Sequence, residues 1–230
     1  MLHLSRIRDK YSNIFSIYSK DILERGSKMQ HIFKKGSGNK PVFLLLHGTG
    51  GTEHSLLTLA DMIDPQATVL SVRGNVLENG MPRFFRRLAE GIFDEKDLVF
   101  RTKELNHFLN EAAEQYNFDR QNIIAIGYSN GANIAASLLY HYENALKGAI
   151  LHHPMVPRRG VTLPNLEGTS VFIAAGTNDP ICPQQEALDL EQTLTAAKAD
   201  VAIHWENYGH QLTHTEVLAA KQWYENRFSI

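Results

Sequence analysis

The feature that most constrains the fold is an alternation of short apolar runs with helical patterns along most of the 230-residue chain. Uninterrupted apolar runs of this length are typical of parallel strands that are buried on both faces. Strands are predicted at 42–46, 67–72, 122–127, 149–152, 171–175 and 201–206. Helices are predicted from Thr52 to about Ile63, from Asp94 or Asp97 to about Tyr116, and at 132–140, 184–197 and 212–227. The alternation predicts an α/β protein with a mostly parallel central sheet and helices on both faces, with ligand chemistry at the carboxyl ends of the strands.

Two segments depart from this alternation. Residues 1–28 mix apolar and charged side chains, and they are predicted to be an N-terminal extension, either disordered or a short amphipathic helix. No linker rich in Pro, Ser or Gly divides the rest, which predicts a single domain at 29–230. Residues 73–93 lack a clean period and are predicted to form a long functional loop.

The composition is that of a globular protein, and it argues against several function classes. Lys and Arg number 23 against 25 Asp and Glu, a net charge of −2, so the chain has no basic surplus for binding nucleic acid or anionic membranes. Cys182 is the single cysteine, which excludes an intramolecular disulfide and favours the cytoplasm. No apolar run approaches the ~18 residues of a membrane span, and residues 1–28 lack the pattern of a secretory signal.

The sequence Gly127-Tyr128-Ser129-Asn130-Gly131 matches the G-x-S-x-G pattern between a predicted strand and a predicted helix. That context is the one in which the pattern presents a nucleophilic serine on a sharp turn, and the glycines keep the strand and helix free of colliding side chains. A glycine-rich turn with an incidental serine is the alternative. We favour Ser129 as a nucleophile.

A serine hydroxyl needs a base to accept its proton and an acid to orient that base. In the α/β-hydrolase arrangement the chain order is nucleophile, acid, histidine, with the last two on loops after late strands. Asp179 follows the strand predicted at 171–175, and His210 follows the one at 201–206. Asp179 and His210 are therefore the predicted acid and base.

An acyl-transfer intermediate also needs two hydrogen-bond donors for its oxyanion. The residue after the nucleophile, Asn130, is expected to supply one main-chain N–H, and the loop at 47–51 the other. A phosphate-binding loop is the alternative for 47–51. It fails because Glu53 occupies the third glycine position of G-x-G-x-x-G, and no Gly-Lys-Ser/Thr ending follows.

A zinc site is the main alternative for His210. His210 and His214 are four residues apart, as in the zinc helix H-E-x-x-H, but Gln211 stands where a metalloprotease needs its glutamate. We therefore predict no metal.

Four ordered motifs together resemble the phospholipase/carboxylesterase family of α/β-hydrolases across about 29–230. They are Leu46-His47-Gly48-Thr49-Gly50-Gly51, Gly127-Tyr128-Ser129-Asn130-Gly131, Gly176-Thr177-Asn178-Asp179-Pro180 and Gly209-His210. Within the family, the stretch from Arg73 to Arg87 is similar to small bacterial carboxylesterases of the hydroquinone-stress-associated type. The resemblance implies an esterase or thioesterase that acts through Ser129, Asp179 and His210, with Thr49 and Asn130 as oxyanion donors and no metal or organic cofactor.

The leading hypothesis is a serine carboxylesterase that hydrolyses small or medium acyl esters through an acyl-enzyme. An acyl thioesterase or lysophospholipase is the nearest enzymatic alternative, and a non-catalytic binding protein on a hydrolase fold is the alternative of another class. The expected partner is a small-molecule ester, and a homodimer is left open.

Three arginines lie within five residues of the loop predicted at the active-site end of the sheet. Arg83, Arg86 and Arg87 either form a solvated basic face or bring a cation to the cleft that selects a substrate carboxylate.

Overall fold

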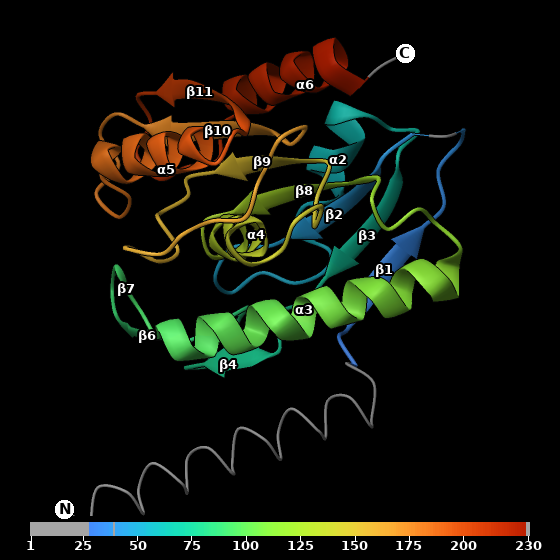
Figure 1. The fold of residues 1–230 in the computed structure, drawn as a ribbon, viewed down its shortest axis with the longest axis horizontal. Coiled ribbons are helices and arrows are strands. Elements are labelled where there is room, and N and C mark those ends of the chain that lie inside the picture. The colour runs from blue at the N-terminus through green and yellow to red at the C-terminus, as the bar shows by residue number, and fades with distance from the viewer. Residues whose placement is uncertain (1–27, 39, 229–230) are drawn as a thin grey trace, which may run out of the picture.

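A single seven-stranded sheet forms the centre of the molecule in the computed structural model, which describes residues 28–38 and 40–228 (Figure 1). In spatial order its strands are β1 (His31–Lys34), β3 (Thr68–Val72), β2 (Val42–Leu46), β8 (Ile123–Tyr128), β9 (Gly148–His152), β10 (Ser170–Gly176) and β11 (Asp200–Glu206). Only the edge strand β1 runs antiparallel to its neighbour. The carboxyl ends of six parallel strands therefore meet at one edge of the sheet.

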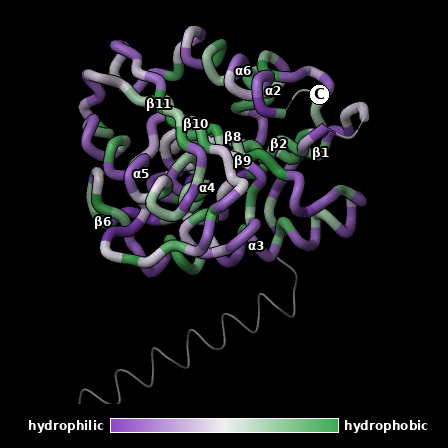
Figure 2. Tube along the Cα trace, turned by 45° about the horizontal axis from the view of Figure 1, so that its top comes forward, coloured by the Kyte–Doolittle hydropathy of each residue, from purple (hydrophilic) through white to green (hydrophobic). Residues whose placement is uncertain are grey.

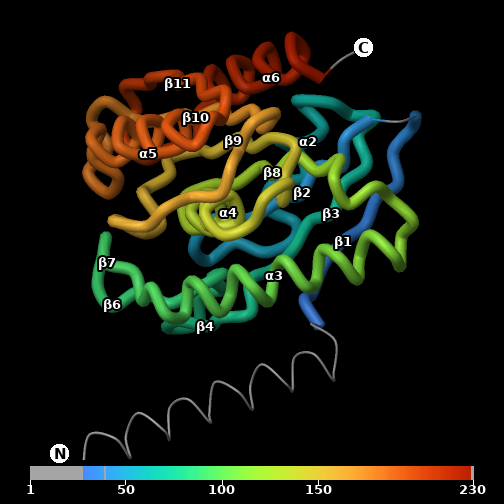
Figure 3. Tube along the Cα trace, viewed as in Figure 1, coloured from blue at the N-terminus to red at the C-terminus, as the bar shows by residue number. Residues whose placement is uncertain are grey.

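Helices cover both faces of this sheet. They are α2 (Leu57–Ile63), α3 (Glu95–Tyr116), α4 (Asn130–His141), α5 (Gln184–Ala196) and α6 (His214–Phe228). One buried cluster joins α3, α4 and α5 to the sheet, and a second joins α2 and α6 to its other face. Hydrophobic residues accordingly concentrate along the central strands, whereas the segments around them carry many hydrophilic residues (Figure 2). The tube view shows the chain passing from the blue edge at β1 to the orange and red strands β10 and β11 at the opposite edge (Figure 3).

The predicted α/β architecture is confirmed, with strand ends within one residue of those expected. The first helix is shorter than predicted: residues 53–56 form turns, and α2 begins at Leu57. The helix that follows residue 93 begins after Asp94, whose side chain accepts a hydrogen bond from the Asp97 main-chain N–H. Of the two predicted caps, Asp94 is thus the one that the structure uses.

The sequence predicted a long loop at 73–93. The structure instead forms two short antiparallel hairpins there. One pairs β4 (Val76–Glu78) with β5 (Met81–Arg83), and the other pairs β6 (Arg87–Ala89) with β7 (Ile92–Phe93). Strands of two or three residues are too short to produce a recognisable period. Between the hairpins, Phe84 and Phe85 are buried in the core and anchor the segment.

The predicted extension lies outside the described residues, apart from its last residue, and the boundary at 29 stays a prediction. None of the described helices combines the length and the apolar character that crossing a membrane requires.

Candidate active site

Ser129 lies on the sharp turn between β8 and α4, with φ 51° and ψ −112°. Such values are rare for a residue with a side chain, and they cost conformational energy that the surroundings must offset. The turn is possible because glycines flank it. A Cβ atom at Gly127 would lie 2.6 Å from the Ala132 nitrogen, and one at Gly131 would collide with the main chain of Leu46. Both glycines of the motif are therefore required by close main-chain packing.

The structure brings Ser129, His210 and Asp179 together in one chain of hydrogen bonds. The Ser129 hydroxyl lies 2.9 Å from His210 Nε2, and His210 Nδ1 lies 2.7 Å from Asp179 Oδ2. With the proton of the neutral ring on Nδ1, that nitrogen donates to the carboxylate and Nε2 accepts from the hydroxyl. Loops that follow β8, β10 and β11 supply the three side chains, so the sheet edge sets their relative positions.

The Asp179 carboxylate is buried, and both of its oxygens accept hydrogen bonds. Its Oδ1 accepts main-chain N–H bonds from Ile181 (2.8 Å) and Cys182 (3.0 Å), and its Oδ2 accepts from His210. Burial by itself disfavours the charged form, but the bonds from Cys182, His210 and Ile181 outweigh it, and they lower the pKa of Asp179 below its ordinary value. Asp179 is therefore an anion at neutral pH.

A cavity of about 210 Å³ opens in front of Ser129. Thr49 and Asn130 line it together with Ser129 and His210, so the two expected oxyanion donors reach the same cavity as the serine. The Thr49 hydroxyl accepts a hydrogen bond of 2.6 Å from Arg83 Nη1, which ties the loop after β2 to the β4–β5 hairpin. Asn130 holds the same region from the other side, because its Oδ1 accepts from the Phe84 N–H at 2.7 Å.

The three arginines differ in position. Arg83 and Arg87 line the cavity and share the carboxylate of Glu78, at 3.2 and 2.8 Å. The Arg83 side chain is only 5% exposed, whereas that of Arg87 is 32% exposed. Arg86 is 62% exposed, is not among the residues that line the cavity, and faces Asp94 and Asp97 instead. The expectation that Arg86 flanks the cleft is therefore not supported by the geometry.

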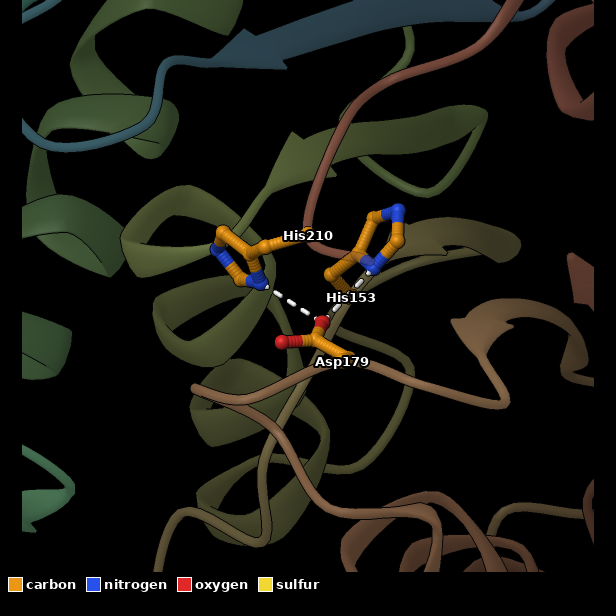
Figure 4. A group of neighbouring side chains, drawn as sticks. All are labelled: His153, Asp179 and His210. Carbon is orange, nitrogen blue, oxygen red and sulfur yellow. Dashed lines mark hydrogen bonds and ion pairs between the residues drawn. The ribbon is translucent and has the colours of Figure 1, made fainter. Parts of the chain in front are cut away.

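Sequence reasoning missed the residues behind Asp179. His153 Nδ1 lies 3.0 Å from the same Asp179 Oδ2 that His210 contacts, and both bonds are drawn in Figure 4. His153 also reaches Glu216 on α6, at 3.3 Å. The sequence carried two signals: His153 follows a strand end, and Thr213-His214-Thr215-Glu216 has the pattern of a helix-capping box. Neither signal indicates that the two residues meet.

His153, Asp179 and His210 also form a group of three metal-type donors among the described residues, with donor atoms within 4.8 Å of one another. Both histidines use the nitrogen that faces Asp179 to bond its Oδ2, so hydrogen bonds account for this proximity. The zinc-helix alternative has no geometric support, because His210 lies in the loop before α6 and His214 is the first residue of that helix.

Comparison with known proteins identifies the family of this chain. The dienelactone hydrolase family matches residues 85–220, more than half of the chain. The chain belongs to this family. A relative from Bacillus subtilis (strain 168), named "Putative hydrolase MhqD", is 58% identical over 197 residues, which cover 86% of this chain and 98% of the relative.

Several solved structures are also similar to this chain. The crystal structure of the Bacillus cereus carboxylesterase is 69% identical with a TM-score of 0.87, covering 90% of this chain and 98% of that one. YahD, determined with malic acid, is 35% identical with a TM-score of 0.82, covering 86% and 99% of the two chains. A carboxylesterase from Mesorhizobium loti is 29% identical with a TM-score of 0.77, covering 82% and 89%.

These comparisons confirm the predicted α/β-hydrolase fold, the likeness to bacterial carboxylesterases and the prediction of a hydrolytic enzyme. The sequence motifs pointed to the phospholipase/carboxylesterase family by name, whereas the matching family is named for dienelactone hydrolases. Both descriptions concern α/β-hydrolases, and the dienelactone hydrolase match includes Ser129, Asp179 and His210.

Proposed function

We propose that this dienelactone hydrolase family member is a serine carboxylesterase that acts through Ser129, His210 and Asp179. The observation that carries the proposal is the continuous hydrogen-bond chain from Ser129 to Asp179 at the wall of a cavity. A serine whose hydroxyl bonds a neutral imidazole can lose its proton to that ring as it attacks an acyl carbon.

In the first half-reaction, Ser129 Oγ forms a bond to the acyl carbon while His210 Nε2 takes the hydroxyl proton. The bond to the alcohol then breaks, and the His210 proton goes to the departing alkoxide oxygen. In the second half-reaction, water attacks the acyl-enzyme with His210 again as base, and Ser129 is regenerated. Asp179 holds the ring in the required tautomer and stabilises the imidazolium that forms at each step.

Main-chain N–H groups of Thr49 and Asn130 are the proposed oxyanion donors. Asn130 is the first residue of α4, and the N–H groups of a first helical turn have no partner within the helix. Its side chain and the Thr49 hydroxyl are both held by hydrogen bonds, so these two loops are set in place before substrate binds.

The size of the cavity favours short acyl esters. At about 210 Å³ it lies below the ~300–1,000 Å³ that are common for drug-sized ligands, which argues against the long acyl chain of a lysophospholipid. A thioesterase would use the same residues and is separated by comparing an ester with its thioester analogue. A series of acyl chain lengths would locate the preferred substrate.

Arg87 is the proposed contact for an anionic group on the ester. It lines the cavity, it is partly exposed, and the Glu78 carboxylate with which it pairs is shared with Arg83. Among the relatives, YahD was solved with malic acid, a dicarboxylic acid. A cytoplasmic location and a homodimer stay predictions.

A fluorophosphonate probe tests the proposal directly, because it reacts covalently with an activated serine. We expect labelling of the wild-type protein at Ser129 and none in Ser129→Ala, with ester hydrolysis reduced on the order of 10⁴- to 10⁶-fold. Ser170→Ala, at the start of β10, is the matched control and should label normally. A Ser129→Ala variant that keeps a tenth of the activity would refute the assignment, and an unlabelled wild-type protein would favour the non-catalytic alternative.

A further inference from the structure

Behind the proposed triad lies a second array of buried ionisable side chains. His153 Nδ1 lies 3.0 Å from Asp179 Oδ2, and His153 Nε2 lies 3.3 Å from Glu216 Oε2. The other oxygen of Glu216, Oε1, lies 2.6 Å from His152 Nδ1. The side chains of these four residues are at most 1% exposed. An unbroken chain of contacts therefore runs from the Ser129 hydroxyl to His152, on the far side of Glu216.

The surroundings of His153 determine its protonation. Each of its ring nitrogens faces only oxygen acceptors: Asp179 Oδ2 at Nδ1, and Glu216 Oε2 with the Gln211 carbonyl (3.1 Å) at Nε2. A neutral imidazole carries one N–H and leaves the other nitrogen as an acceptor, which would place a lone pair against these oxygens. Both nitrogens donate only when the ring is an imidazolium.

The electrostatics of the three groups agree with this geometry. Burial by itself would lower the pKa of His153, but hydrogen bonds and charges from Glu216 and Asp179 outweigh burial and raise it above the ordinary value. Burial likewise opposes ionisation of Glu216, yet the bonds from His152 and His153 lower the pKa of that carboxyl to about 2. The electrostatics thus favour an imidazolium between two carboxylates, as the geometry does.

His152 needs no second proton. Its Nδ1 donates to Glu216, and its Nε2 has no hydrogen-bond partner in the described part of the chain. The neutral ring with its proton on Nδ1 satisfies this arrangement, so His153 is the one residue of the array whose contacts require a positive charge.

The main chain fixes the position of the His153 ring. His153 follows β9 with φ 52°, a value in the left-handed region that non-glycine residues rarely adopt. Its N–H donates to the Ala174 carbonyl on β10 at 2.7 Å, and its own carbonyl accepts from Cys182 Sγ at 3.4 Å. A strained residue held by contacts on both sides is typical of a functional site.

We propose that His153 is a positioning residue for the reaction: as a buried imidazolium it anchors Asp179 and places a fixed positive charge beside His210. The inference rests on the proposed roles of Ser129, His210 and Asp179. His153 and His210 bond the same Asp179 oxygen, and their ring centroids lie 5.1 Å apart. A second positive charge on His210 is therefore disfavoured by the first.

The charge of His153 depends on all the ionisable groups that face it. They are Asp179 and Cys182 from the loop after β10, Glu216 from α6, His210 from the loop after β11, Tyr128 from β8, and the adjacent His152. Cys182 stays a neutral thiol because burial raises its pKa, and burial likewise raises the pKa of the Tyr128 phenol. The fixed charges around His153 are thus the two carboxylates.

The variant Glu216→Gln removes one of the two counter-ions of His153 with little change in shape. Thr213 and Glu216 form a capping box at the start of α6, with the Glu216 N–H donating to Thr213 Oγ1 and the Thr213 N–H donating to Glu216 Oε2, both at 3.2 Å. Glutamine supports the same box. The carbonyl oxygen of the glutamine keeps the box when it takes the Oε2 position, whereas an NH₂ group there donates to His153 Nε2 and loses the bond from the Thr213 N–H. In both orientations the negative charge that stabilises the His153 imidazolium is lost.

The test is the pH dependence of kcat/KM for a short-chain ester, with active enzyme counted by fluorophosphonate titration. We expect Glu216→Gln to move the acid limb upward by about 1 pH unit, because the repulsion at His210 is lost. His153→Gln should move it in the same direction and also lower kcat, since it removes the Asp179 anchor. Glu104→Gln is the matched control, because Glu104 is a buried, ion-paired glutamate on α3, and it should leave the limb unmoved. Glu216→Gln with lower stability but a wild-type acid limb would overturn the proposal.

A second measurement is independent of catalysis and of variant folding. Nitrogen-15 spectra of the histidine rings in the wild-type protein report whether each ring nitrogen carries a proton. We expect both nitrogens of His153 to be protonated at about pH 7 and those of His152 to show one proton. A neutral His153 ring would overturn the inference whatever the activity of the variants. If Ser129→Ala kept its activity, the proposed function would be wrong. The protonation of His153 would still be measured by these spectra, so the two failures are distinguishable.

Discussion

The Tyr128 hydroxyl donates a hydrogen bond of 2.6 Å to the main-chain carbonyl of His210. The residue before the proposed nucleophile therefore holds the main chain of the proposed base. The two rings also lie together, with centroids 5.6 Å apart. This contact joins the loop after β8 to the loop after β11, so the Tyr128 phenol helps to hold His210 at its distance from Ser129.

We expect Tyr128→Phe to lower kcat by about fivefold, the equivalent of one hydrogen bond of about 1 kcal/mol, because the His210 loop loses a tether. KM should change little, since the ring itself remains at the cavity wall. Steady-state kinetics on a short-chain ester measure both constants. Tyr142→Phe, in the turn after α4, is the matched control, and equal kinetics for the two variants would show that the tether is unimportant.

The features that the sequence could predict are those encoded locally. The apolar runs at 42–46 and 122–127 identify central strands, and the glycines around Ser129 identify the turn that presents it, because each signal lies within a few residues. Chain order then selected Asp179 and His210. The structure brings all three side chains into hydrogen-bond contact.

What the sequence could not predict depends on packing between distant segments. His153 and Glu216 are 63 residues apart, and no pattern records their contact. The arginines illustrate a second limit, since Arg86 and Arg87 are adjacent yet face different surroundings. Which of them reaches the cavity depends on how the short hairpins β4–β5 and β6–β7 sit on the core.

Asp179→Asn should reduce kcat on the order of 10³- to 10⁴-fold while the protein stays folded. Asparagine can keep the N–H bonds from Ile181 and Cys182 through its carbonyl oxygen. Its NH₂ group would then face His210 Nδ1, which favours the tautomer with the proton on the wrong nitrogen.

Single-turnover kinetics on an activated ester would measure this loss in the acylation step. Asp189→Asn serves as the control, because Asp189 is a half-buried residue of α5 that contacts Arg159 and Gln185. A loss of less than about tenfold in Asp179→Asn would exclude Asp179 as the residue that orients His210.

Glu216 is expected to make folding stability depend on pH in the acid range. Its folded pKa is about 2, against 4.5 for the ordinary side chain, so its contribution is complete above pH 4.5 and is lost as the pH falls toward 2. The size of the shift corresponds to a contribution of about 3 kcal/mol at neutral pH. His153 acts in the opposite sense: its raised pKa stabilises the fold below 6.5, and this contribution is lost as the pH rises through the folded value.

Urea unfolding of the wild-type protein and of Glu216→Gln measures the contribution of Glu216 to the free energy of unfolding at each pH. The difference in free energy of unfolding should be largest near about pH 7 and should shrink as the pH falls to about 3. Comparing the two proteins cancels the contributions of other carboxylates whose pKa values are lowered, such as Asp64. A difference that does not change with pH would mean that Glu216 contributes by packing and capping alone.

Arg87 should determine whether the enzyme prefers esters that carry a carboxylate. A partly desolvated arginine paired with a carboxylate contributes about 1.5 to 3 kcal/mol, so a succinate half-ester should exceed its methyl-capped analogue in kcat/KM by about ten- to a hundredfold. Arg87→Ala should abolish the preference. Arg86→Ala should leave it intact, because Arg86 faces Asp94 and Asp97 instead of lining the cavity.

Glu78 pairs with both Arg83 and Arg87, so the effect of Arg87→Ala on Glu78 must be considered. Arg87→Ala leaves Glu78 paired with the buried Arg83 alone, so the cavity wall loses one positive charge and keeps its shape at Thr49. The preference of the wild-type enzyme should persist at physiological ionic strength, because a partly buried pair is screened less than an exposed one. Equal kcat/KM for the charged and capped esters on the wild-type enzyme would mean that Arg83 and Arg87 serve only to hold Glu78 and the two hairpins.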